Sequence, residues 1–235
     1  MTDLLLRDAR LWGSETATDL LIRDGVVAAS GPSLDPAGAP VEDLGGKLLL
    51  PGFVDAHAHV DKTLWGGPWV PHSAAPGLQN KIRNGVERRP ELGIPSADYM
   101  TNLLGQMVAS GTTHVRSHVD VDLESGLDGV HALREALSRL GGRITAELVA
   151  FPQAGLLTRP GTAELMDQAL AEGVELVGGI DPAGLENDPV RHLDVVFGLA
   201  DKHGAGVDIH LHDGGPLGGW QYELIIERTR ALGLA

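Results

Sequence analysis

The chain has 235 residues, of which 43% are hydrophobic and 21% are charged, so it is long enough for one or two globular domains. Its formal net charge of −14 argues against nucleic acid or an anionic membrane as the main partner, because such partners are bound by concentrated lysine and arginine. Cysteine is absent, which excludes disulfides and thiolate metal sites and fits a cytoplasmic location, and the sequence predicts neither a signal peptide nor a membrane-spanning helix.

Residues 1–50 predict a small β module. The segments DLLLRDARLW and TDLLIRDGVVAAS carry apolar runs of strand type, each bounded by polar or glycine-containing turns. The segment GPSLDPAGAP is predicted to be a loop because of its proline and glycine content. A change of pattern at residue 51 places the boundary of a second, larger domain there.

From residue 51 onward, apolar runs alternate with amphipathic stretches, a pattern typical of βα units around a parallel sheet. No G-x-G-x-x-G follows the first run, so a dinucleotide-binding sheet is disfavoured. Polar and ionisable residues gather at the C-terminal ends of the predicted strands, the rim where a (β/α)₈ barrel carries its chemistry. The predicted strands are residues 52–60, 113–121, 142–152, 174–182 and 204–213, and the predicted helices are residues 96–111, 126–142, 161–173, 188–204 and 218–233.

The number of βα units bears on the domain assignment. Five units are visible, whereas a closed TIM-like (β/α)₈ barrel contains eight in about 250 residues. Residues 51–235 are therefore predicted to be the N-terminal portion of such a barrel, in a chain that is truncated or incompletely recorded. The edges formed by the first and fifth strands would then lack barrel neighbours.

The segment LLLPGFVDAHAHVDKTLW suggests a metal site. His57, His59 and Asp61 are spaced by two along the predicted strand, so their side chains are expected on one face. Two imidazoles at this spacing can bind one metal ion at about 2.0–2.1 Å. The alternative is that these histidines only form hydrogen bonds, but their position after a Pro-Gly turn and an apolar run favours metal ligands. Asp61 is expected to contact the substrate.

The fifth predicted strand repeats this arrangement. In GVDIHLHD, Asp208, His210 and His212 share one face, and Asp213 begins the following loop. His210 lies deeper in the strand and is the predicted third ligand of a catalytic site with an open water position. His212 is expected beside the site or in the loop rather than on the metal.

Two further strand ends carry candidate site residues. His118 lies nearest the rim on the second strand, where it can touch a substrate or metal-bound water, with a buried core histidine as the alternative. Gln153 follows the third strand, where its amide can pair with a cyclic amide or amidine, with a role in the turn as the alternative. The fourth strand has no lysine to bridge two ions, and Lys62 and Lys81 are elsewhere, so one ion is predicted. The other histidines are expected in solvent: His72, His131, His192 and His203.

The segments PGFVDAHAHVDKT, GTTHVRSHVDV, VAFPQAG, ELVGGID and VDIHLHDGG follow one another across nearly the whole of the chain. As a set they resemble the amidohydrolase superfamily, specifically its cytosine-deaminase-like branch. The resemblance implies a β-sandwich domain beside the barrel, formed from both ends of the chain. Residues 1–50 would then be the N-terminal part of that sandwich.

The resemblance also implies roles for individual residues. His57, His59 and His210 match metal ligands, usually of zinc or iron, and Gln153 matches a glutamine that contacts the substrate. His118 corresponds to a histidine near the site. Asp213 stands where the family has a proton-shuttling glutamate, with a side chain that is one methylene shorter. A histidine of the sixth strand and an aspartate of the eighth would lie beyond residue 235.

These observations predict a metal-dependent hydrolase that acts on a C–N bond of a cyclic, nitrogen-rich small molecule. The first choice is a deaminase of a pyrimidine- or triazine-like ring, in which metal-activated hydroxide attacks and Asp213 or a neighbour protonates the leaving nitrogen. One alternative is hydrolysis of a ring amide, an alkylamine substituent or an acyclic N-acyl substrate. Another is a truncated, inactive chain that serves as a binding or assembly component. A homo-oligomer is compatible with the sequence.

Overall fold

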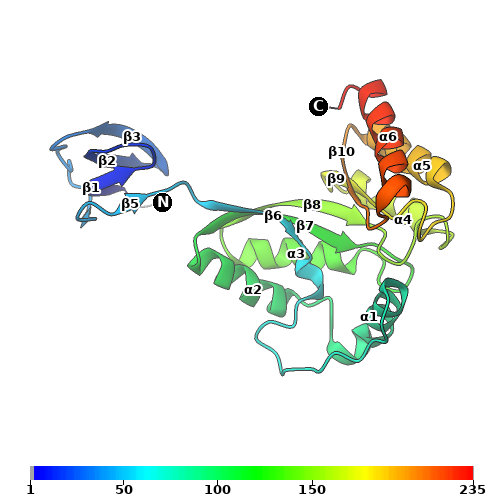
Figure 1. The fold of residues 1–235 in the computed structure, drawn as a ribbon. Coiled ribbons are helices and arrows are strands. Elements are labelled where there is room, and N and C mark those ends of the chain that lie inside the picture. Colours follow the sequence, from blue (N-terminus) through cyan, green and yellow to red (C-terminus); the bar gives the residue numbers. More distant parts are fainter. Residues whose placement is uncertain (1–2, 235) are drawn as a thin grey trace. The chain divides into compact units, whose positions relative to one another are not determined.

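The structure, a computed structural model, describes residues 3–234 and falls into two compact units, Met1–Gly52 and Phe53–Ala235 (Figure 1). Each unit has its own sheet and its own buried residues. No helix among the described residues has both the length and the apolar composition needed to cross a membrane.

The N-terminal unit is built on one mixed sheet of five strands. The strand order is β3-β2-β1-β4, with β5 also paired to β1; β2 is antiparallel to its neighbours, whereas β4 and β5 run parallel to β1. Leu5, Ala9 and Leu20 are buried in this unit. A sandwich requires a second sheet, and residues 3–52 as described hold one, so the sandwich stays a prediction. The strands are β1 (Leu4–Leu11), β2 (Ala17–Arg23), β3 (Val26–Gly31), β4 (Val41–Asp43) and β5 (Leu48–Leu49).

The C-terminal unit contains a five-stranded parallel sheet in which neighbours in the chain are also neighbours in space. The order is β10-β9-β8-β7-β6, which is the arrangement expected of successive βα units. The five strands begin and end close to the predicted positions. They are β6 (Phe53–Ala58), β7 (Thr112–Asp120), β8 (Thr145–Phe151), β9 (Leu176–Ile180) and β10 (Gly206–His210).

Helices cover one face of this sheet and leave polar side chains on the other. Val115 and Val119 of β7 pack in an apolar core with residues of the helices, whereas Arg116 and His118, which alternate with them, point to the opposite face. Capping residues set the helix boundaries, as with the side chain of Ser96, which accepts a hydrogen bond from the backbone of Tyr99. The covering helices are α2 (Ala97–Ala109), α3 (Asp128–Arg139), α4 (Thr162–Ala171) and α5 (Pro189–His203), and α6 (Gly215–Ala231) packs beside α5.

One helix was not predicted. Helix α1 (Leu78–Leu92) lies in the long connection between β6 and α2, after a short 3₁₀ turn, η1 (Val60–Lys62) (Figure 1). Gly77 precedes the helix without a side-chain cap, and Pro90 lies inside it, although Gly93 ends it in the left-handed conformation typical of a C-cap. The helix places Arg89 against the C-terminal end of β7.

His192 was predicted to be in solvent, and this is wrong. It lies on the buried face of α5 and is 0% exposed. Burial lowers the pKa of His192 to about 4, so the ring is held neutral near neutral pH. Of the other three, His72 is exposed, His131 bonds Glu172, and His203 is partly buried beside Asp167.

Candidate functional site

Four histidine rings converge at the C-terminal ends of three strands. His57 comes from β6, His59 from the residue after β6, His118 from β7 and His210 from the end of β10. Each ring offers one nitrogen, and these nitrogens all lie within 4.8 Å of one another. The structure therefore brings together the three predicted metal ligands and the predicted rim histidine.

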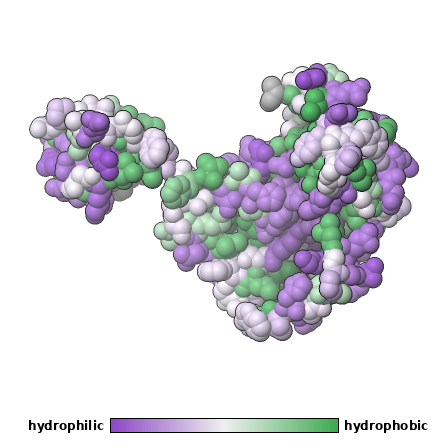
Figure 2. Space-filling view, viewed as in Figure 1, coloured by the Kyte–Doolittle hydropathy of each residue, from purple (hydrophilic) through white to green (hydrophobic). Residues whose placement is uncertain are grey.

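The convergence depends on a strongly curved sheet. Strands β6 and β10 are at opposite ends of the sheet, and in a flat sheet four inter-strand spacings would separate them by about 19 Å. Nevertheless, Nε2 of His59 and Nε2 of His210 are 3.1 Å apart. The polar face of the sheet is thus the concave inner face of part of a barrel. Hydrophilic side chains gather over the region between α1 and α6 (Figure 2).

The geometry and protonation of these rings fit a metal ion. Two nitrogens that each bind one ion at about 2.0–2.1 Å lie roughly 2.8–3.4 Å apart for bond angles between about 90° and the tetrahedral value, and this range includes the observed 3.1 Å. Burial, reinforced by the charge of Lys62, lowers the pKa of His59 to about 2. Burial, with His118 and His57 nearby, lowers the pKa of His210 to about 4. Both rings are therefore neutral near pH 7, the form that binds metals.

One ring nitrogen of His118 has a hydrogen-bond partner, and the other has none among the described residues. Its Nε2 lies 3.2 Å from Oδ1 of Asp208, and Arg116 donates to Oδ2 of the same carboxylate at 3.1 Å. The ring is fully buried, and within residues 3–234 its Nδ1 has no hydrogen-bond partner. A buried, unpaired ring nitrogen beside three further histidines is the kind of atom that a bound ion or substrate satisfies.

The predicted position of Asp61 is wrong. Strand β6 ends at Ala58, and the chain then turns through η1, so the alternation of side chains stops before residue 61. Asp61 is 5% exposed and accepts a hydrogen bond from the backbone N–H of Asp120 at 2.8 Å. Burial, reinforced by the charge of Asp120, raises the pKa of Asp61 to about 7. One oxygen of Asp61 nevertheless lies within 4.8 Å of a ring nitrogen of His59 and of a carboxylate oxygen of Asp120, and the substrate contact stays a prediction.

Two cations that the sequence did not assign to the site neutralise this buried group of carboxylates. Arg89 of α1 bonds both Asp120 and Asp122, and it is itself buried. Lys62 lies 2.8 Å from Oδ1 of Asp120. The sequence signal for Lys62 was its position three residues after His59; Arg89 had no such signal because α1 itself was not predicted.

Lys62 also connects the histidines to Gln153. Its Nζ donates to Oε1 of Gln153 at 2.8 Å and lies 3.3 Å from Nδ1 of His59. This bond fixes which end of the Gln153 amide is the oxygen and leaves the NH₂ group for another partner. Gln153 and Lys62 line one side of a cavity of about 300 Å³ beneath α1.

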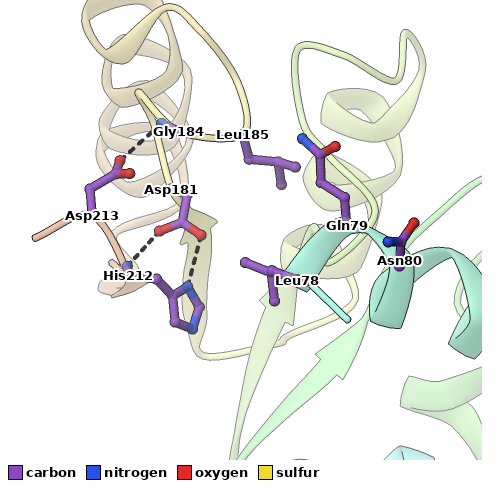
Figure 3. Close-up of a pocket in the computed structure, with 9 residues that line it drawn as sticks. Leu78, Gln79, Asn80, Asp181, Gly184, Leu185, His212 and Asp213 are labelled. Atoms are coloured by element: carbon purple, nitrogen blue, oxygen red, sulfur yellow. Dashed lines mark hydrogen bonds and ion pairs between the residues drawn. The ribbon is translucent and has the colours of Figure 1, made fainter. Parts of the chain in front are cut away.

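A second cavity, of about 370 Å³, is lined by His212 and Asp213 together with residues of α1 and of the loop after β9 (Figure 3). Asp181, which follows β9, binds both the backbone and the ring of His212. Asp213 accepts hydrogen bonds from Gly184 at 2.9 Å and from Gln221 at 3.0 Å. Neither His212 nor Asp213 belongs to the four-histidine group, so the predicted separation of His212 from the ligands agrees with this geometry.

Comparisons with known proteins agree with this arrangement. A family model described as "Amidohydrolase family" matches residues 40–98. The solved structure of N-isopropylammelide isopropylaminohydrolase from Burkholderia multivorans is 43% identical, with a TM-score of 0.92 over 100% of this chain and 59% of that chain. The 5-methylcytosine deaminase from Klebsiella pneumoniae is 26% identical, with a TM-score of 0.77 over 98% of this chain and 56% of that chain.

A curated relative, the protein YahJ of Escherichia coli, whose name describes it as uncharacterized, is 38% identical over 84% of this chain and 44% of its own length. The chain thus spans about half the length of the relatives that it matches. The curved parallel sheet is the half-barrel of a TIM-like fold, as predicted. The chain belongs to the amidohydrolase superfamily, in its cytosine-deaminase-like branch.

Proposed function

We propose that this chain is part of a metal-dependent hydrolase that removes an amino or alkylamino group from a triazine- or pyrimidine-like ring. The observation that carries the proposal is the convergence of His57, His59 and His210 from the two outer strands of the sheet. The aminohydrolase and the deaminase named above support the reaction class, since one is named for N-isopropylammelide and the other for 5-methylcytosine.

In this proposal His57, His59 and His210 hold one divalent ion, zinc or iron. When bound, such an ion supplies Lewis-acid activation of water near neutral pH. The low pKa values of His59 and His210 keep both rings ready to bind it without first losing a proton. His118, positioned by Asp208, faces the same space and is proposed to contact the substrate or the attacking water.

Gln153 is proposed to recognise the ring. Lys62 holds its carbonyl oxygen, so its NH₂ group is left to donate to a ring nitrogen or ring carbonyl. Lys62 is in turn fixed by the buried carboxylate of Asp120. Recognition by a positioned amide selects rings that offer an acceptor, because an unpaired donor in a closed site is costly.

Asp213 is proposed to deliver the proton to the leaving nitrogen. Its bonds to Gly184 and Gln221 fix the carboxylate at the edge of the cavity beside His212. This side chain is one methylene shorter than glutamate, so the departing group must approach the cavity for the transfer to occur. The predicted cytoplasmic location and a homo-oligomer stay predictions.

The test is an assay of the metal-loaded, full-length protein against amino- and alkylamino-substituted triazines and pyrimidines. Release of ammonia or alkylamine with the ring intact is the expected result. Independently of turnover, His57→Ala and His210→Ala should each lose bound metal, as measured by elemental analysis, whereas His131→Ala should retain it. Ring opening, turnover without metal, or no turnover by a metal-loaded protein would contradict the proposal.

A further inference from the structure

The residue that follows β9 has an unfavourable backbone conformation. Asp181 has a φ of +32°, in the left-handed region that side-chain-bearing residues rarely occupy. Its N–H donates to the carbonyl of His210 at 2.9 Å, so the residue is tied to the end of β10. Strain of this kind persists where the surroundings impose it, often at functional sites.

The carboxylate of Asp181 holds His212 by two bonds. Oδ1 accepts the backbone N–H of His212 at 2.5 Å, and Oδ2 lies 2.7 Å from Nδ1 of its ring (Figure 3). Asp181 is only 3% exposed. Because a carboxylate only accepts hydrogen bonds, this contact places a proton on Nδ1 and leaves Nε2 directed away from Asp181.

The open side of His212 faces the cavity of about 370 Å³. The side chain is 52% exposed, and no residue in the described part of the chain forms a hydrogen bond to Nε2. The ring projects from the Asp181 side of the cavity toward Leu78 (Figure 3). Leu78 of α1 and Leu185 of the β9–α5 loop give this cavity apolar walls, and Asp213 also lines it.

This cavity adjoins the proposed reaction centre. The ring centroids of His210 and His212 are 6.1 Å apart, so a small ring held beside His210 can place one substituent against His212. A purely structural histidine would need neither a strained partner nor an exposed nitrogen. A metal-binding role is disfavoured because Asp181 occupies Nδ1 and the ring lies outside the four-histidine group.

The geometry points to a binding site for the leaving group: Nε2 of His212 accepts the N–H of a secondary alkylamino substituent, whose alkyl chain packs against Leu78 and Leu185. This inference rests on the proposed function and narrows its substrate class to rings that carry an alkylamino group. Asp181 acts as a positioning residue for His212. Alignment of the substituent with this pocket also brings its nitrogen toward Asp213.

The decisive comparison uses two substrates on the metal-loaded, full-length protein. One triazine carries an isopropylamino group, and the other carries an N-isopropyl-N-methylamino group, which has no N–H. An unpaired acceptor costs about 1–3 kcal/mol, so the wild-type protein should have a higher kcat/KM for the first substrate. His212→Phe should reduce the ratio of the two kcat/KM values about tenfold or more, mainly through KM. His212→Gln, which retains an acceptor, should preserve part of the preference, and His131→Phe on the surface should leave it unchanged.

Leu185→Ala tests the apolar wall separately. It should lower kcat/KM for the isopropylamino substrate several-fold relative to the unsubstituted amino substrate, while the preference for an N–H remains. The same preference in wild type and His212→Phe, or loss of metal from His212→Phe, would overturn the inference while leaving the proposed function in place. Failure of the wild-type protein to act on any of these rings would overturn the proposed function itself.

Discussion

Nε2 of His59 and Nε2 of His210 lie 3.1 Å apart although 151 positions separate the two residues in the chain. Each ring is near the end of an outer strand of the same sheet. The short distance therefore shows that the sheet is curved. It also shows that ring nitrogens from both outer strands meet at the same place. Several measurable properties depend on it.

The first prediction concerns metal affinity. His59→Ala and His210→Ala should each weaken metal binding by about a hundredfold or more, because even residues that only support a ligand contribute roughly 10–100-fold. Competition with a fluorescent chelator would measure the change. His131→Ala, an exposed histidine bound to Glu172, is the matched control. Unchanged affinity in both ligand variants would show that the rings only bond one another.

The second prediction concerns Arg89. Replacement by leucine should destabilise the protein by about 3–5 kcal/mol, because Asp120 and Asp122 would be left buried with one fewer cation. The neighbouring Arg88 pairs with Glu91, which is largely exposed, and Arg88→Leu should destabilise the protein much less, because solvent screens this pair. Urea denaturation of the two variants would compare these values. Equal decreases in the free energy of unfolding would mean that the buried ion pairs of Arg89 stabilise the protein no more than the exposed pair of Arg88 does.

The third prediction concerns the pH dependence of stability through His192. The folded-state pKa is lowered to about 4 by burial, below an ordinary value of about 6.5. The unfolded state therefore takes up a proton first as the pH falls. The stabilisation is fully present above about pH 6.5 and is lost between pH 6.5 and 4, by up to about 3 kcal/mol.

A His192→Met variant removes this titration while keeping an apolar side chain of similar size. Its free energy of unfolding should fall less steeply than that of the wild-type protein between pH 6.5 and 4.5, as measured by denaturation at several pH values. The difference between the two proteins cancels the contributions of the other histidines. Parallel curves would contradict the assignment of a buried, neutral His192.

The fourth prediction concerns Glu186, a buried carboxylate that accepts three successive backbone N–H groups, those of Leu156, Leu157 and Thr158. Glu186→Ala should release the loop that begins at Gln153. Amide exchange over residues 154–161 should accelerate at least tenfold, because bonds to a charged acceptor contribute about 1.5–3 kcal/mol. Exchange in the distant helix α3 should not change, and uniform acceleration would indicate global destabilisation instead.

Much of the fold follows from local sequence patterns. The five strands of the parallel sheet were predicted because apolar runs alternate with capped amphipathic stretches, as at Ser96 for α2 and at Asp188 for α5. The grouping of His57, His59 and His210 followed from a general property of parallel sheets, in which polar residues at strand ends meet at one rim.

Two of the remaining features, the position of α1 and that of Asp61, depend on tertiary contacts that no local pattern encodes. Helix α1 has no side-chain cap and contains Pro90, and its position is fixed by the pairing of Arg89 with carboxylates more than thirty residues away. Asp61 accepts a hydrogen bond from the end of β7 because the chain turns after Ala58. The alternation of side chains along a strand does not predict this turn. His192 did have a signal, since it shares a helical face with Val196 and Ala200.

The curved sheet described above also bears on how the chain is held together. A metal ion bound by the histidines would link the two outer strands of the sheet, β6 and β10. Its coordinate bonds would connect residues that are 151 positions apart in the chain. Because these ligands are assembled only in the folded chain, the free energy of binding the ion would add to the stability of the fold. Chelation would then loosen the strand borders at the same time as it removes reactivity, so that catalytic competence and resistance to proteolysis would decline together.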